Sequence, residues 1–207
     1  MIKVLVFDFS GVLYGSRFEM LTKSLIDIVP GLESDKIIET FYNKYNDYKS
    51  GNLTESTFWN EVFSILEVPR DKISKITKIV FDKGIFTENK YLLSQIERLS
   101  KNYKIAVLSN SSREMEWVLN DSEYHKFFDE FFWSHNFGAR KPAEKFYNAV
   151  VEKYKVKPSE ILFFDDKVRN TSAANELGWN TVIFTPEIYK SEELFLNELE
   201  KFEIKSS

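Results

Sequence analysis

The apolar stretch at the start of this 207-residue chain constrains its fold more than any other feature. Residues 1–7 read MIKVLVF, and Lys3 is the one charged side chain before Asp8. A short run of this kind, rich in aliphatic side chains, is typical of a strand that is buried on both faces at the centre of a parallel sheet. An Asp at the end of such a strand can simply cap a turn. It can also lie at the ligand crevice of an open α/β sheet, where Gly11 would let the chain turn tightly or a ligand approach the backbone.

The pattern changes from strand to helix after Gly15 and stays helical through residue 85. Apolar side chains recur at intervals of three and four, which predicts amphipathic helices over residues 17–29, 34–50, 54–66 and 69–84. Four such helices without a strand between them make a small bundle. We therefore expect residues 15–85 to form a cap, inserted directly after the first strand and lying over the crevice.

Strands and helices alternate from residue 86 onward. Apolar runs predict strands over residues 104–108, 130–134, 161–164 and 181–184, with helical patterns between them and a charged amphipathic helix from about residue 191. This alternation indicates a parallel sheet with right-handed crossovers. The predicted fold class is therefore α/β: a Rossmann-like, three-layer core of residues 1–14 and 86–207, with the small α-helical bundle of residues 15–85 inserted as a cap.

Polar side chains follow the predicted strands at the point where the strands end. Because the carboxyl ends of parallel strands meet at one edge of the sheet, residues far apart in the sequence gather there. The residues that this edge would collect are Asp8, Ser109, Asn110, Lys141, Asp165 and Asp166. Each has a simpler explanation by itself: a helix cap for Ser109, a solvated charge for Lys141, a turn for the two Asp. All of them in order at successive strand ends are improbable by chance.

This constellation resembles that of the haloacid dehalogenase superfamily, over nearly the whole length of the chain. The matching segments are DFSGVL at residues 8–13, VLSN at 107–110, RKP at 140–142 and FFDD at 163–166, with Asn170 and LG at 177–178. The helical insert after the first segment matches the α-helical cap of that superfamily. The sequences VLSN, GARKP and FFDD are most similar to the branch that holds hexose-1-phosphate phosphatases and the N-terminal domain of soluble epoxide hydrolase.

The resemblance implies a phosphatase that acts on a small-molecule phosphate ester. Asp8 would be the nucleophile and would form an aspartyl-phosphate, which divides one hard displacement into two easier ones. Ser109 and the amides near Asn110 would hold phosphate oxygens at a helix N-terminus, with Gly11 giving the ligand access to the backbone. Lys141 would offset the repulsion between an anionic nucleophile and an anionic substrate.

The resemblance also implies a magnesium site. Its direct ligands would be the carboxylates of Asp8 and Asp166 and the backbone carbonyl of Ser10, an all-oxygen set of the kind that Mg²⁺ prefers. Asp165 belongs to the same acidic pair at the end of its strand. Together with Asn170, Asp165 would position the waters of the metal.

Ser10 departs from the pattern of most phosphatases of the superfamily, which carry a second Asp two residues after the nucleophile. A serine hydroxyl cannot act as a general acid and base near neutral pH, and such assistance is worth about 10²–10⁴-fold in rate. Three interpretations remain open: a magnesium-dependent phosphatase or phosphotransferase, a metal-free hydrolase of carbon–halogen bonds, and a catalytically weak protein that binds a ligand or partner. The dehalogenase branch usually has Tyr at this position and lacks the acidic pair, so Asp165 and Asp166 favour the phosphatase.

Composition excludes several other classes of function. The chain has no Cys, so it has neither disulfides nor a thiol nucleophile, and its net charge of −4 gives no basic footprint for nucleic acid. No apolar run reaches the roughly 18 residues of a membrane span, and the N-terminus lacks the pattern of a signal peptide. We therefore expect a cytoplasmic protein, monomeric or homodimeric, without nucleic-acid or membrane partners.

Substrate choice is expected to reside in the cap and in the loop after Gly11. The candidates are four large side chains that core or surface positions also explain: Tyr14, Arg17, Tyr48 and Trp59. His125 and His135 are assigned no role.

Overall fold

The computed structural model describes residues 1–15, 17–49, 52–80, 87–111 and 113–205. Its centre is a five-stranded parallel sheet with the strand order β3-β2-β1-β4-β5. The strands are β1 (Val4–Phe7), β2 (Lys104–Ser109), β3 (Glu130–Trp133), β4 (Ile161–Asp165) and β5 (Asn180–Ile183). The N-terminal strand is therefore the central one, and the predicted α/β fold class is confirmed.

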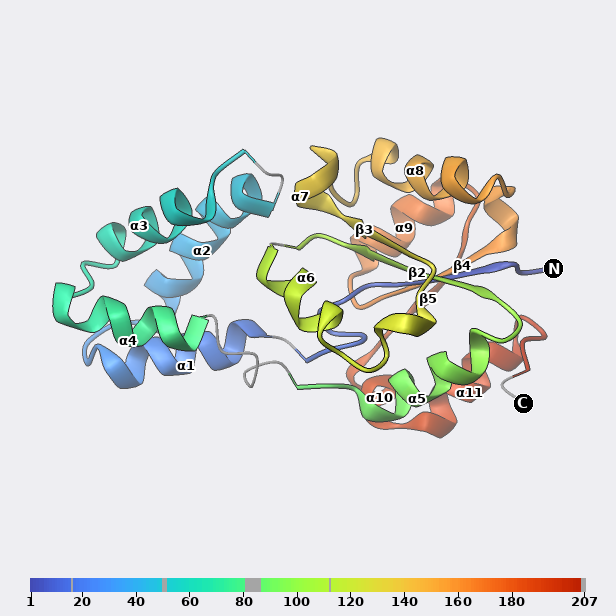
Figure 1. Cartoon of the computed structure of the whole chain (residues 1–207), viewed down its shortest axis with the longest axis horizontal. Helices are drawn as coiled ribbons and strands as arrows, with labels where there is room; N and C mark the ends of the chain where they lie inside the picture. The colour runs from blue at the N-terminus through green and yellow to red at the C-terminus, as the bar shows by residue number, and fades with distance from the viewer. Residues whose placement is uncertain (16, 50–51, 81–86, 112, 206–207) are drawn as a thin grey trace.

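Both faces of the sheet are covered by helices, as Figure 1 shows. On one face lie α8 (Glu144–Tyr154) and α9 (Val168–Glu176), and on the other lie α5 (Lys90–Leu99), α10 (Pro186–Lys190) and α11 (Glu192–Glu200). Alternate side chains of β1 point to opposite faces of the sheet, as the two-residue period of a strand requires. Val4 and Val6 pack in the cluster with α8, whereas Leu5 and Phe7 pack in the cluster with α5 and α11.

The helices α1 (Arg17–Ile28), α2 (Ser34–Lys49), α3 (Glu55–Ile65) and α4 (Arg70–Val80) lie together beside the carboxyl ends of the strands (Figure 1). They have a hydrophobic cluster of their own, in which Phe41, Phe58 and Trp59 make edge-to-face ring contacts. Thr54 caps α3 by accepting a hydrogen bond from the Thr57 N–H. The helix α2 contacts α7 (Ser134–Phe137).

Two details differ from the sequence prediction. Ser134 begins α7 instead of ending β3, and the short helix α10 was not predicted. The predicted cap boundary at residues 85 and 86 lies outside the described residues. The remaining elements are α6 (Arg113–Asn120) and two short 3₁₀ helices, His125–Phe127 and Pro158–Glu160.

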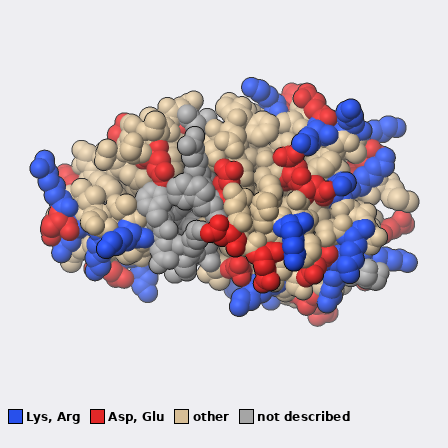
Figure 2. Space-filling model, viewed as in Figure 1, with Lys and Arg blue, Asp and Glu red and all other residues tan. Residues whose placement is uncertain are grey.

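The surface carries charges of both signs. Figure 2 shows Lys and Arg side chains interspersed with Asp and Glu over the visible face. Every helix within the described ranges is too short or too polar to cross a membrane.

Candidate active site

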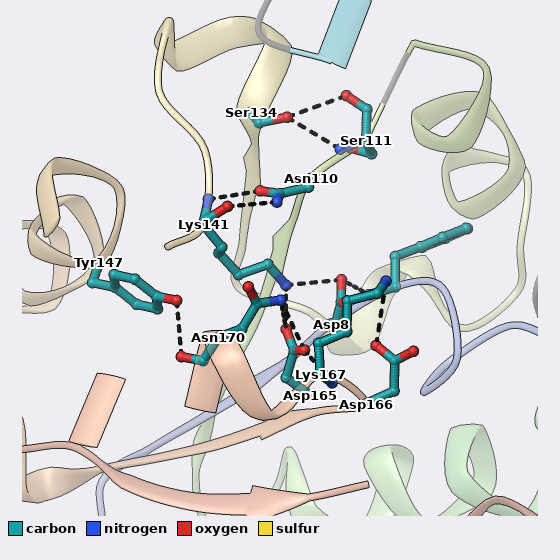
Figure 3. Close-up of polar contacts among 11 residues, drawn as sticks. Asp8, Asn110, Ser111, Ser134, Lys141, Tyr147, Asp165, Asp166, Lys167 and Asn170 are labelled. Carbon is teal, nitrogen blue, oxygen red and sulfur yellow. Dashed lines mark hydrogen bonds and ion pairs between the residues drawn. The ribbon is translucent and has the colours of Figure 1, made fainter. Parts of the chain in front are cut away.

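Lys141 joins two acidic strand ends in the interior of the protein (Figure 3). Its side chain is completely buried, and its Nζ lies 3.0 Å from Asp8 Oδ1 and 2.6 Å from Asp165 Oδ2. The ammonium group also lies 5.2 Å from the centre of the Phe163 ring. Asp8 directly follows β1 and Asp165 ends the neighbouring strand β4, so the parallel pairing of these strands brings the two carboxylates together.

Asp165 uses both of its carboxylate oxygens in hydrogen bonds. Oδ1 accepts from the backbone N–H of Lys167 at 2.8 Å and from Asn170 Nδ2 at 2.9 Å. Oδ2 accepts from Lys141 Nζ at 2.6 Å and from Asn170 Nδ2 at 3.0 Å. Asn170 is itself oriented by Tyr147, whose hydroxyl donates to the Asn170 carbonyl at 2.9 Å. Both carboxylate oxygens of Asp165 are therefore engaged by groups of the protein itself.

Asp166 differs from Asp165 because one of its oxygens is buried without a hydrogen bond. Among the described residues, no donor lies within hydrogen-bonding distance of Asp166 Oδ1. One carboxylate oxygen from each of Asp8, Asp165 and Asp166 can be chosen so that all three lie within 4.8 Å of one another. An orphaned buried acceptor beside two further carboxylates fits a small, hard cation that binds through oxygen.

Gly11 makes room for Asp166. Its φ is +86°, and a Cβ atom built there would lie 2.8 Å from both Cγ and Oδ2 of Asp166. The turn expected at Gly11 is confirmed, and its close neighbour within the chain is the Asp166 carboxylate.

Burial and the neighbouring charges shift the pKa values of these groups. Burial by itself would raise the pKa of Asp8, but the ammonium groups of Lys141 and Lys167 bring it below its usual value. Burial raises the pKa of Asp165 to about 6, against the attraction of Lys141, which favours the ionised carboxylate. Burial and then repulsion by Asp8 raise the pKa of Asp166. Burial disfavours the charge of Lys141, yet Asp165 and Asp8 raise its pKa above the usual value.

Asn110 fixes the backbone of Lys141. Its Oδ1 accepts from the Lys141 N–H at 2.7 Å, and its Nδ2 donates to the Lys141 carbonyl at 2.8 Å. Ser109, at the end of β2, is buried at the same edge of the sheet. Ser111, which follows Asn110, accepts at its carbonyl from His135 Nδ1, 3.0 Å away, so His135 has a structural contact. The predicted strand-end residues are therefore gathered at one edge, and Asn110 holds the chain that carries the buried ammonium.

The large side chains suggested for substrate contact lie in the hydrophobic clusters. Tyr14 is 1% exposed and stacks on Phe9, with 4.6 Å between ring centres, in the cluster beneath the sheet. Tyr48 and Trp59 are buried in the cluster of the inserted helices. The side chain of Arg17 lies outside the described part of the structure. Ser10 is half-buried next to Gly11, in a bridge with Tyr14.

Lys167 was missed by the sequence analysis. Its Nζ lies 3.7 Å from Asp166 Oδ1, and its side chain remains 49% exposed (Figure 3). Its position directly after the two strand-end Asp was the one signal in the sequence, but charged loop residues are common at that place.

The chain is similar in sequence to two proteins named as hydrolytic enzymes. It is 28% identical over 198 residues to a D-ribitol-5-phosphate phosphatase of Bacteroides thetaiotaomicron, a match that covers 90% of this chain and 93% of that protein. A hydrolase of Schizosaccharomyces pombe described as putative and uncharacterised is 23% identical over 160 residues, 71% of this chain and 70% of that one.

Solved structures share the fold. A HAD-family enzyme of B. thetaiotaomicron has a TM-score of 0.74 at 22% identity, over 94% of this chain and 98% of that chain. The same enzyme in complex with magnesium and inorganic phosphate has a TM-score of 0.73 at 23% identity, over 94% and 100% of the two chains. The L-2-haloacid dehalogenase of Xanthobacter autotrophicus has a TM-score of 0.65 at 19% identity, over 97% and 83%.

A family model matches residues 2–178, which include every strand-end residue described above. The chain belongs to the haloacid dehalogenase-like hydrolases.

Proposed function

We propose that this hydrolase is a magnesium-dependent phosphatase that acts on a small phosphorylated metabolite. The observation that carries the proposal is the pairing of a buried, positively charged Lys141 with a carboxylate cluster in which Asp166 Oδ1 has no hydrogen-bond donor among the described residues. The buried lysine keeps Asp8 ionised as a nucleophile, and the orphaned oxygen of Asp166 suits a bound cation.

Asp8 would act by covalent catalysis. One carboxylate oxygen attacks the phosphorus, the bond between phosphorus and the ester oxygen breaks, and the departing alkoxide takes a proton from solvent water. Water then attacks the phosphorus of the aspartyl-phosphate, which releases inorganic phosphate and restores the Asp8 carboxylate. Lys141 would reduce the repulsion between Asp8 and the anionic substrate in both steps, because its ammonium lies 3.0 Å from Asp8 Oδ1.

The magnesium ion would be held by carboxylate oxygens of Asp8 and Asp166 and by the backbone carbonyl of Ser10. When bound, the ion supplies positive charge that stabilises the charge developing on the phosphoryl oxygens. Asp165 would act through other residues: its hydrogen bonds orient the side chains of Lys141 and Asn170 and fix the backbone of Lys167. Ser109 and the amides near Asn110 would contact the phosphate.

Ser10 in place of a second Asp limits the substrates that fit this mechanism. Without a carboxyl at position 10, the leaving oxygen receives less help from a protein acid. Leaving groups that need little protonation, such as an anomeric sugar oxygen or an acyl group, would be affected least.

The four helices α1–α4 would act as the cap that selects the substrate. Their own hydrophobic cluster and their place beside the carboxyl ends of the strands support a division into a core of residues 1–14 and 86–207 and a cap of residues 15–85. The similarity to a D-ribitol-5-phosphate phosphatase directs the search to phosphorylated sugars and polyols.

A phosphate-release assay tests the proposal. Purified protein is incubated with 4-nitrophenyl phosphate, acetyl phosphate and a panel of sugar and polyol phosphates, in excess magnesium or excess chelator. Hydrolysis is expected with magnesium and not with chelator. Asp8→Asn should abolish it, because the amide keeps the shape of the side chain and loses its nucleophilic charge. Asp27→Asn, on the exposed side of α1, is the matched control and should retain activity.

A parallel chloride-release assay tests the alternative reaction. Release of chloride from 2-chloropropionate in the presence of chelator would overturn the phosphatase proposal and favour a dehalogenase. Intact-mass spectrometry of quenched protein adds a second test, since the proposed intermediate adds the mass of one phosphoryl group to wild-type protein and not to the Asp8→Asn variant.

A further inference from the structure

Lys167 is the second positive charge beside the acidic cluster, and it is held in a different way from Lys141. Its backbone N–H donates to Asp165 Oδ1 at 2.8 Å, which fixes the main chain. Its side chain is 49% exposed, and the ammonium reaches back to within 3.7 Å of Asp166 Oδ1, the oxygen that has no hydrogen-bond donor among the described residues. Figure 3 shows this ammonium on the side of Asp166 that faces Asp8.

The two lysines therefore differ in their freedom to move. Lys141 is completely buried and contacts both Asp8 and Asp165 at hydrogen-bonding distance, so moving it would leave two buried carboxylates uncompensated. Lys167 makes one longer ion pair from a half-exposed side chain, which can turn into solvent without loss of packing. A cation that enters the cluster can displace Lys167 and cannot displace Lys141.

The charge of the cluster leads to the same conclusion. Three carboxylates face these two ammonium groups, and the positive charges of Lys141 and Lys167 both favour the ionised form of Asp8. A divalent cation next to Asp8 and Asp166 would bring a third and fourth positive charge close to the Lys167 ammonium. Repulsion between cations about 4 Å apart is substantial even in water.

We propose that Lys167 is a built-in counter-ion that competes with the divalent cation for Asp166 and so sets the magnesium concentration at which the site fills. This inference rests on the proposed magnesium site. In the metal-free protein Lys167 partly neutralises Asp166. When magnesium binds, the side chain turns outward to the mouth of the site, where its charge becomes available to an anionic substrate.

Magnesium binding to variants without substrate provides the test. Isothermal titration calorimetry and the melting temperature as a function of magnesium concentration are measured for wild type, Lys167→Met and Lys167→Arg. Lys101→Met is the matched control, because it removes one exposed lysine charge from the turn before β2, at the opposite edge of the sheet.

Lys167→Met is expected to bind magnesium about fivefold more tightly than wild type, because magnesium then no longer has to break the ion pair between Lys167 and Asp166, which for two unit charges about 4 Å apart in water is worth about 1 kcal/mol. Without metal, Lys167→Met should melt at a lower temperature than wild type. Added magnesium should raise its melting temperature by more than it raises that of wild type. Lys167→Arg and Lys101→Met should bind magnesium like wild type. The difference between Lys167→Met and wild type should shrink at high salt.

Two results overturn the inference in distinguishable ways. Magnesium binding that is equal or weaker in Lys167→Met than in wild type shows that Lys167 does not compete, and leaves the phosphatase proposal standing. Failure of wild type and Lys167→Met alike to bind magnesium overturns the proposed metal site and this inference together.

Discussion

The α-carbon of Gly11 lies against the carboxylate of Asp166, so closely that a Cβ at position 11 would be 2.8 Å from Asp166 Cγ and Oδ2. The loop after β1 and the end of β4 therefore fit together only because residue 11 has no side chain. This contact sets the distance between the candidate metal ligand Asp166 and the loop that follows the candidate nucleophile, Asp8.

Gly11→Ala should weaken magnesium binding at the site by displacing the Asp166 carboxylate. Backbone strain at positive φ should also lower the free energy of unfolding by roughly 1–2 kcal/mol. Gly31→Ala separates the two effects, because Gly31 has a φ of +98° and a Cβ atom there would meet no atom of the described residues within 4 Å. Calorimetric magnesium titration and urea unfolding of both variants provide the measurement. Equal magnesium affinity in the two variants would contradict the steric role of Gly11.

Lys141→Met should destabilise the protein by roughly 3–5 kcal/mol, because it leaves Asp8 and Asp165 buried without their shared counter-charge. Adding Asp165→Asn to this variant removes one of the stranded charges, so the double variant should be more stable than the two single effects predict. A coupling of about 1–3 kcal/mol is expected from urea unfolding of the complete cycle. Additive effects would mean that the ion pair contributes little beyond packing.

Tyr147→Phe should make the protein less sensitive to alkaline pH. Burial, with contributions from Asp165 and Asp8, raises the pKa of Tyr147 above its usual value of about 10. The folded state keeps a proton that the unfolded chain loses above that pH, so stability falls as pH rises, by roughly 1.4 kcal/mol per pH unit for this group. Urea unfolding from pH 8 to 11 should show a shallower decline in the variant.

The same substitution should cost about 1 kcal/mol at pH 8, where it removes the hydrogen bond to the Asn170 carbonyl. Tyr42→Phe is the control, because the Tyr42 side chain is 68% exposed, and it should leave the slope unchanged. An identical alkaline slope in wild type and Tyr147→Phe would refute the argument from burial.

Ser10→Asp should accelerate hydrolysis of substrates with poor leaving groups more than that of activated ones, provided that magnesium is present. A carboxyl at position 10 could protonate a strongly basic leaving oxygen and later activate water, so the aspartyl-phosphate should also have a shorter lifetime. The new negative charge lies close to Asp8, which is why the bound cation is needed. Steady-state rates on an alkyl and an aryl phosphate decide the matter, and equal or slower rates on both would show that another group already supplies the proton.

The sequence predicted the positions of the site residues along the chain better than the way their side chains are held. Strand-end placement of Asp8 and Asp165 follows from two apolar runs and the rule for parallel sheets, and the structure brings these two carboxylates onto one lysine. The complete burial of Lys141 was not predictable, because a lysine in a loop is ordinarily solvated. Its backbone is held by Asn110, which follows β2 and lies 31 residues earlier in the chain.

Aromatic residues show the same limit. Tyr14 fits both a core position and a ligand contact in sequence, and only the stacking on Phe9 decides for the core. Ser134 follows an aromatic run that reads as strand, yet it begins a helical turn because its side chain and that of His135 bind Ser111. These outcomes depend on contacts between distant segments, which local patterns do not encode.

The central place of β1 in the sheet has a consequence for how this protein folds. Val4 pairs on one side with Lys104 and on the other with Ile161, so β1 is synthesised long before either of its partner strands. Such non-local pairing is slow, and an apolar strand that waits unpaired is prone to aggregation. The inserted helices, whose contacts are local, can meanwhile form between the first strand and its partners. The surroundings of the candidate nucleophile at the end of β1 are therefore complete only after β4, which carries Asp165, has paired with β1.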